Sequence, residues 1–253
     1  MLIGDMTWPD LAPAPDDFAV VPVGALEPHG PHLPLGSDTM ISEHFARHLA
    51  DDLGAHIAPA VGYGVATPAQ RLGGTFPGVI SITGTTFTAL ITEILTSLAG
   101  HGYRRLVLLN SAIDNISFLC EAAREVTDRV PRSRVMIVNW WDVVGEDFRD
   151  ALAAETGTAR SDDHHAGMVE SSLVMHISPH AAQPDRLPAD GGQEHPRRIR
   201  YHLYPPPADT ATSAGIVYSA AHASSDLGKY IAEQVARELT DAVRREFNAP
   251  LPS

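Results

Sequence analysis

Two carboxylates and one imidazole lie close together in residues 24–38, which read GALEPHGPHLPLGSD. In extended backbone, residues two apart project to the same side, so Glu27 and His29 can point at one position beyond the end of a strand. Asp38 would join them from the start of the next helix. Carboxylates and imidazole are typical ligands of a catalytic metal. The pattern predicts a metal site, although such triplets also arise by chance, with Asp38 then acting only as a helix cap.

The elements that must position these residues alternate between strands and helices. Phe18–Gly24 is short, apolar and β-branched, which is typical of a strand buried on both faces. Further strands are predicted at 56–61, 105–110 and 135–140. Helices are predicted from the cap Ser37–Asp38 to Gly54 and at 85–99, 115–126 and 227–247, with a long functional loop at 179–214. The alternation favours one α/β domain over residues 1–253, with three αβα layers and a mostly parallel central sheet.

Composition disfavours several classes of binding partner. The 253 residues include 31 acidic and 18 basic side chains, a formal charge of -13, which disfavours nucleic acid and anionic membranes as partners. The single cysteine, Cys120, excludes an internal disulfide framework, is expected to be buried, and fits a cytoplasmic protein. There is no apolar run of about 18 residues and no leader-like start, so we expect neither a membrane span nor export.

Several ordered motifs resemble the creatininase family of metal-dependent amidohydrolases. The family's first motif, E-x-H-G-x-H with an Asp nine residues after the first His, matches Glu27–His32 and Asp38. The likeness continues through residues 62–64, 73–78, 101–110, 140–142 and 164–172. It implies a creatininase-like fold, a homohexamer, and metal ligation by Glu27, His29 and Asp38. It also implies substrate contacts near Trp141, and we expect His32 and Ser161 to line the same pocket.

The chain departs from the family pattern after the central strand. The family usually reads N-G-H-x-E-N or N-G-H-G-G-N there, whereas residues 110–115 read N-S-A-I-D-N. Ala112 stands in place of a histidine ligand and cannot coordinate an ion. Asp114 still offers a carboxylate, one methylene shorter than Glu. We therefore expect one ion per chain rather than two, held by Glu27, His29, Asp38 and Asp114.

A second departure precedes the segment 164–172. His165 matches the family's catalytic histidine and is the candidate proton donor to the leaving nitrogen, with Glu170 as the acceptor that orients it. His164 replaces a glutamate, and its role stays open between ligand, base and surface residue. Ser161 stands where creatininase has a tryptophan lid. Creatinine itself is therefore not the expected substrate.

These residues predict a metal-dependent hydrolase of a small-molecule, non-peptide, cyclic C–N amide. Zinc is favoured by the mixed nitrogen and oxygen ligands, with manganese or iron possible because Asp114 adds oxygen character. One alternative is a metal-poor protein redirected to cyclisation or elimination, or to a noncatalytic binding role. A peptidase of a short modified peptide is another. His44 and His48 have metal-compatible i,i+4 spacing, but we expect them to form a solvated helix face.

Overall fold

A four-stranded parallel sheet forms the centre of the molecule. The computed structural model describes residues 1–66, 76–192, 203, 207 and 212–248. The strand order is β2-β1-β3-β4, with all neighbours parallel. The strands are β1 (Phe18–Val23), β2 (His56–Ile57), β3 (Arg105–Asn110) and β4 (Arg134–Asn139). Val23 pairs with Asn110, which pairs with Asn139, so three strands end at the same edge.

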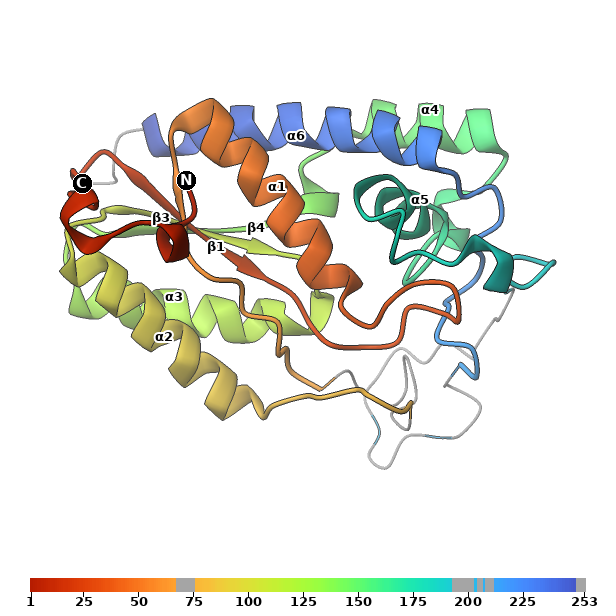
Figure 1. Cartoon of the computed structure of the whole chain (residues 1–253), viewed down its shortest axis with the longest axis horizontal. Helices are drawn as coiled ribbons and strands as arrows, with labels where there is room; N and C mark the ends of the chain where they lie inside the picture. Colours follow the sequence, from red (N-terminus) through yellow and green to blue (C-terminus); the bar gives the residue numbers. More distant parts are fainter. Residues whose placement is uncertain (67–75, 193–202, 204–206, 208–211, 249–253) are drawn as a thin grey trace.

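Helices cover both faces of this sheet, which confirms the predicted three-layer αβα arrangement. In Figure 1, α2 (Gly84–Gly100) and α3 (Ile116–Arg129) lie on one side, and α1 (Ser37–Leu53) and α6 (Ser225–Asn248) lie on the other. Two further helices, α4 (Glu146–Thr156) and α5 (Met168–Ile177), were not predicted. Both are short. No residue of α5 is exposed, so this helix shows no clear amphipathic period in the sequence.

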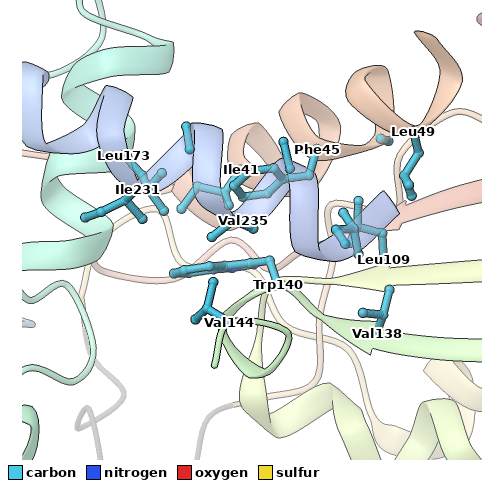
Figure 2. Close-up of a cluster of buried hydrophobic side chains, with 14 of the residues drawn as sticks. Ile41, Phe45, Leu49, Leu109, Val138, Trp140, Val144, Leu173, Ile231 and Val235 are labelled. Carbon is cyan, nitrogen blue, oxygen red and sulfur yellow. The ribbon is translucent and has the colours of Figure 1, made fainter. Parts of the chain in front are cut away.

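Each face of the sheet has its own apolar core. The core beneath α2 and α3 is built on Val21, Leu106 and Leu108, whereas Val20 and Leu109 face α1, α5 and α6. Figure 2 shows the second core around Trp140, whose ring stacks against Phe45 at 6.2 Å between centroids. Alternate residues of the buried strands therefore supply the two cores, as expected for a parallel sheet covered on both sides.

Four sequence predictions need correction. The strand predicted at 56–61 has only two regular residues, because Pro59 lacks an N–H group, and pairing returns as a single bridge between Val61 and Val23. Ser37 and Asp38 do not cap α1: the helix begins at Ser37, after Gly36. Cys120 is exposed, because the buried stripe of α3 is Leu119, Ala122 and Val126. Trp140 begins a short 3₁₀ helix rather than ending β4.

The remaining elements follow the predicted pattern with small shifts at their ends. Thr83 caps α2 by accepting a hydrogen bond from Thr86 N at 3.2 Å. Much of the long loop predicted at 179–214, and residues 73–75 of the glycine-rich motif, lie outside the described residues. Within the part of the chain that is described, no helix is both long enough and apolar enough to cross a bilayer.

Candidate active site

His29 occupies the centre of a buried polar cluster beyond the C-terminal end of β1. Its side chain is fully buried, and Nδ1 donates a hydrogen bond to the backbone carbonyl of Glu27 at 3.1 Å. This bond fixes the ring so that Nε2 is the nitrogen that faces the carboxylates. Nε2 lies 3.2 Å from Asp38 Oδ1 and 4.0 Å from Glu170 Oε2. A backbone acceptor on the far nitrogen is the usual way in which proteins orient a metal-binding imidazole.

Asp38 reaches this point from the first turn of α1. The residue is 1% exposed, and its Oδ2 has no hydrogen-bond partner among the described residues. Burial raises the pKa of Asp38 above its usual range, against the opposing effect of His29. Burial also lowers the pKa of His29, but the surrounding carboxylates, Asp38 foremost, outweigh it and raise that pKa. The cluster therefore favours a bound positive charge, either a proton or a metal ion.

His165 and Glu27 form the second part of the cluster. His165 Nε2 donates to the backbone carbonyl of Pro28 at 2.6 Å, and Nδ1 lies 3.5 Å from Glu27 Oε1. The ring centroids of His165 and His29 are 4.3 Å apart. Two consecutive carbonyls of one loop, those of Glu27 and Pro28, thus orient both imidazoles. Burial, followed by the charge on His29, lowers the pKa of His165.

The potential ligand atoms fall into two overlapping groups. Glu27, His29 and His165 form one, and His29, Asp38 and Glu170 form the other, with all ligand atoms of a group within 4.8 Å of one another. The groups share His29, whose Nδ1 is already bonded to a carbonyl. Since one nitrogen binds one ion, the two groups describe a single ion position or two alternatives.

Glu170 enters the cluster from the first turn of α5. Its Oε2 accepts a hydrogen bond from Ala166 N at 2.6 Å, across a tight turn in which Ala166 has φ 51°. The sequence predicted that Glu170 orients His165, but the hydrogen-bond acceptor for that ring is Pro28. Glu170 instead lies beside His29.

Asp163 is a site residue that sequence reasoning missed. Its Oδ1 accepts from Val169 N at 3.3 Å, so the carboxylate caps the start of α5 and holds the turn that presents Glu170. A Cβ at Gly167 would lie 2.2 Å from this oxygen, which explains the glycine. Burial raises the pKa of Asp163 to about 7. Asp163 lies four residues before the N-cap Gly167, so the usual capping pattern does not identify it in the sequence.

His32 is buried behind the cluster. Its Nε2 donates to Ser171 Oγ at 2.8 Å, and that hydroxyl donates to the carbonyl of Ala166 at 3.2 Å. Burial, with a smaller effect from His29, lowers the pKa of His32 to about 4. His32 thus links the first loop to α5. A direct contact of His32 with substrate stays a prediction.

Side-chain amides occupy the last position of β3 and the segment that follows it. Asn115 Oδ1 accepts from Val65 N at 2.9 Å, and its Nδ2 donates to the carbonyl of Gly24 at 3.0 Å. Asn110 Nδ2 donates to the carbonyl of Ala112 at 2.8 Å and to Asn139 Oδ1 at 2.9 Å. Asp114 lies half-buried in the 3₁₀ helix Ile113–Asn115 and belongs to neither ligand group.

Three other predicted site residues lie outside both ligand groups. His164 is exposed, with its ring 5.2 Å from that of Tyr218. Ser161 is exposed and donates to Asp162. Trp141 is half-buried against the apolar core, with its ring perpendicular to that of Trp140. The sequence placed one of these two indoles in the core, and Trp140 is buried as expected.

The donor set fits a divalent cation. Three carboxylates and two oriented imidazoles converge in a buried volume, and Asp38 Oδ2 has no hydrogen-bond partner in the described structure. Buried carboxylates are costly unless they are paired or coordinate a metal. One protonated imidazole neutralises only one of them. Mixed imidazole and carboxylate ligands suit zinc, manganese or iron.

The family model described as creatinine amidohydrolase, of the creatininase family, matches residues 4–243. The chain is 31% identical over 258 aligned residues to creatinine amidohydrolase from Pseudomonas putida, covering 98% of this chain and 97% of that protein. It is also 31% identical to the mycofactocin precursor peptide peptidase of Mycobacterium ulcerans, covering 72% of this chain and 64% of that protein.

Solved structures give the same result. A structure named creatininase Mn aligns with a TM-score of 0.90 and 28% identity, covering 98% of this chain and 99% of the other. A mutant creatininase of the Zn–Zn type aligns with a TM-score of 0.89 at the same identity, covering 98% of each chain.

Proposed function

This chain belongs to the creatininase family of amidohydrolases, and we propose that it is a metal-dependent hydrolase of a C–N amide bond in a small, cyclic, non-peptide substrate other than creatinine. The observation that carries this proposal is the position of His29 Nε2. This atom faces buried carboxylates at the strand edge where parallel α/β sheets place their sites. A whole-length relative that acts on creatinine supports amide chemistry.

His29, Asp38 and Glu170 would hold the ion, with Glu27 and His165 on the adjoining side. A bound divalent ion polarises an amide carbonyl and lowers the pKa of water. We propose zinc, with manganese or iron as alternatives, and the creatininase structures with manganese and zinc support this choice. Because only one nitrogen of His29 is available, we propose one ion per chain.

His165 is the proposed proton donor to the leaving nitrogen. Its lowered pKa keeps the ring neutral at pH 7, so it can take a proton from the attacking water and pass it on. Pro28 holds Nε2, so Nδ1 would carry the proton. Glu27 Oε1, 3.5 Å away, would stabilise the charged ring. If His165 instead binds the ion, Glu27 is the remaining base on this side.

Two positions argue against creatinine as substrate. Ser161 is exposed and small where the family has an apolar lid, and Ala112 removes a family ligand. A pocket without that lid would accept a larger amide. His164 and Tyr218, whose rings are 5.2 Å apart, are candidate walls of such a pocket, together with Trp141.

Metal removal and an amide panel test the proposal. The purified protein is stripped with a chelator, reloaded with zinc or manganese, and assayed on five- and six-membered cyclic amides and ureas, with creatinine for comparison. We expect hydrolysis of at least one cyclic amide, lost on stripping and restored on reloading. Activity that survives stripping undiminished would contradict the metal mechanism. Creatinine turnover at about 1 s⁻¹ or faster would contradict the proposed specificity.

A peptidase is the second candidate, and the likeness to the mycobacterial peptide peptidase favours it. Short modified peptides therefore belong in the same panel. A protein that retains no metal and cleaves neither class would favour a redirected reaction, such as cyclisation or elimination, or a noncatalytic binding role.

We also propose that residues 1–253 form one domain, supported by the match over residues 4–243. A cytoplasmic homohexamer stays the expected assembly, and light scattering would test its size.

A further inference from the structure

Three histidines meet outside the proposed active site, between α1 and α5. His44 and His48 lie one turn apart on α1, and their Nε2 atoms are 3.2 Å apart. His176, in the last turn of α5, has its ring 6.4 Å from that of His44. All three are half-buried. The solvated helix face predicted for His44 and His48 is therefore wrong, because α5 covers part of this surface.

We propose that His44 and His48 chelate a divalent transition-metal ion. His176 becomes the third ligand once its side chain rotates toward them, because the three residues do not bring their ligand atoms within 4.8 Å of one another in the observed geometry. Two metal–nitrogen bonds of about 2.0 to 2.1 Å that meet at 90 to 110° place their nitrogens about 2.9 to 3.4 Å apart. The observed separation of 3.2 Å falls within this interval. The two rings are inclined at 70° and bring their Nε2 atoms together.

The charge of the cluster suits a metal that prefers neutral nitrogen ligands. Burial, followed by His48, His176 and Arg47, lowers the pKa of His44 to about 4, so its ring is neutral at pH 7 and loses no proton on binding. Imidazoles without carboxylates favour zinc, copper or nickel over magnesium, calcium or manganese. The positive charge of Arg47 opposes a bound cation, so this site is weaker than the carboxylate-rich one.

The position of the cluster gives such an ion a structural consequence. His44 follows Asp38 by six residues on α1, and His176 follows Glu170 by six residues on α5. Each pair is therefore separated by about 9 Å along its helix. An ion held by the three histidines would connect the same two helices that bring Asp38 and Glu170 to His29. It would stabilise their packing from outside the reaction site.

Zinc binding to matched variants tests the proposal. The full chain, with its tightly held ion retained, is dialysed against buffers of fixed free zinc, and the bound zinc is measured by elemental analysis. At saturation we expect His48→Gln to bind one zinc fewer per chain than the wild type. The control His101→Gln, which changes an exposed histidine at the end of α2, should bind as the wild type does. His176→Gln should keep the stoichiometry with at least about tenfold weaker affinity.

Cu²⁺ gives a second measurement, because its electron paramagnetic resonance spectrum shows splitting from bound nitrogen. We expect a nitrogen-split signal in the wild type that His44→Gln and His48→Gln both lose. Equal zinc stoichiometry and unchanged copper spectra in these variants would show that the two rings only hydrogen-bond to each other. The histidine site should persist in His29→Gln, so its failure and that of the proposed active site give different results.

Discussion

The ends of β1 and β3 lie side by side at one edge of the sheet, yet they are built from different chemistry. Val23 pairs with Asn110, so the two loops begin at the same level. The β1 loop contains the buried ionisable residues His29 and His32, and Asp38 follows at the start of α1. The β3 loop contains amides and Ala112.

The difference lies in how each region satisfies its polar groups. Asn115 bonds to Val65 and Gly24, so its amide is complete without any added ligand. At the β1 end, His29 Nε2 and Asp38 Oδ1 are 3.2 Å apart. The lone pairs of the two atoms repel each other unless a proton or a metal ion lies between or beside them. The β3 end thus acts as a scaffold, whereas the β1 end requires a proton or an ion.

The largest expected effect is loss of the bound ion, which a substitution at the β1 end should cause and one at the β3 end should not. His29→Gln should lose the tightly held ion, because His29 belongs to both ligand groups. Asp114→Asn should retain it, because Asp114 belongs to neither. Elemental analysis after dialysis against metal-free buffer measures both variants. Loss of the ion from Asp114→Asn would show that the β3 loop supplies a ligand after all, and would contradict the comparison.

Adding a metal-binding side chain at the β3 end should create a second metal site there. Ala112 is 5% exposed and lies just after β3, whose last residue pairs with the end of β1, so Ala112→His adds an imidazole beside the β1 loop. The retained ion content should rise from about one toward two per chain, because an added nitrogen supplements the carboxylates already present. The same elemental analysis decides the outcome, with Ala112→Leu as a control for side-chain size. A wild-type chain that already retains two ions would contradict the argument.

The sequence predicted the scaffold and the first motif because both depend on local patterns. Buried β-branched strands, helix ends at glycines and the spacing of Glu27 and His29 are all properties of short segments. The partners of His29 beyond Asp38 were harder to predict. Glu170 reaches it across a turn whose shape depends on Ala166 and the cap from Asp163, and no pattern in the sequence reports that geometry.

The prediction that His44 and His48 form a solvated helix face was wrong for a related reason. Helical spacing correctly places both rings on one face of α1, but their burial depends on where α5 packs. No clear pattern in the sequence indicates α5, so its contacts with α1 could not be predicted. Cys120 shows the converse: its apolar neighbours suggested burial, and Leu119 and Phe118 do pack against the core, but Cys120 is exposed.

Removal of a scaffold amide should cost stability and leave ion binding intact. Asn115→Ala leaves Val65 N and the carbonyl of Gly24 without their partner in a buried region. We expect the free energy of unfolding to fall by about 2 to 3 kcal/mol, since each abandoned group costs about 1 to 3 kcal/mol. Urea denaturation measures the change, with the exposed Ser117→Ala on α3 as control. An Asn115→Ala protein of wild-type stability that had lost its ion would reverse the roles assigned to the two ends.

The smallest expected effect is the contribution of His32, in the β1 loop, to the pH dependence of stability. Burial holds the pKa of His32 at about 4 in the folded chain, below the usual value of 6.5. As pH falls from 7 to 5, the unfolded chain binds a proton at this residue before the folded chain does, so stability decreases. His32→Gln keeps a donor for Ser171 but cannot titrate, and it should reduce that decrease by about 1 to 2 kcal/mol. Urea denaturation of the metal-free protein at both pH values measures this. Asn115→Ala should keep the full wild-type sensitivity, because an amide does not titrate. If His32→Gln retained the same sensitivity, the loss of stability at low pH would have to come from other histidines whose pKa is lowered by burial, His44 and His165.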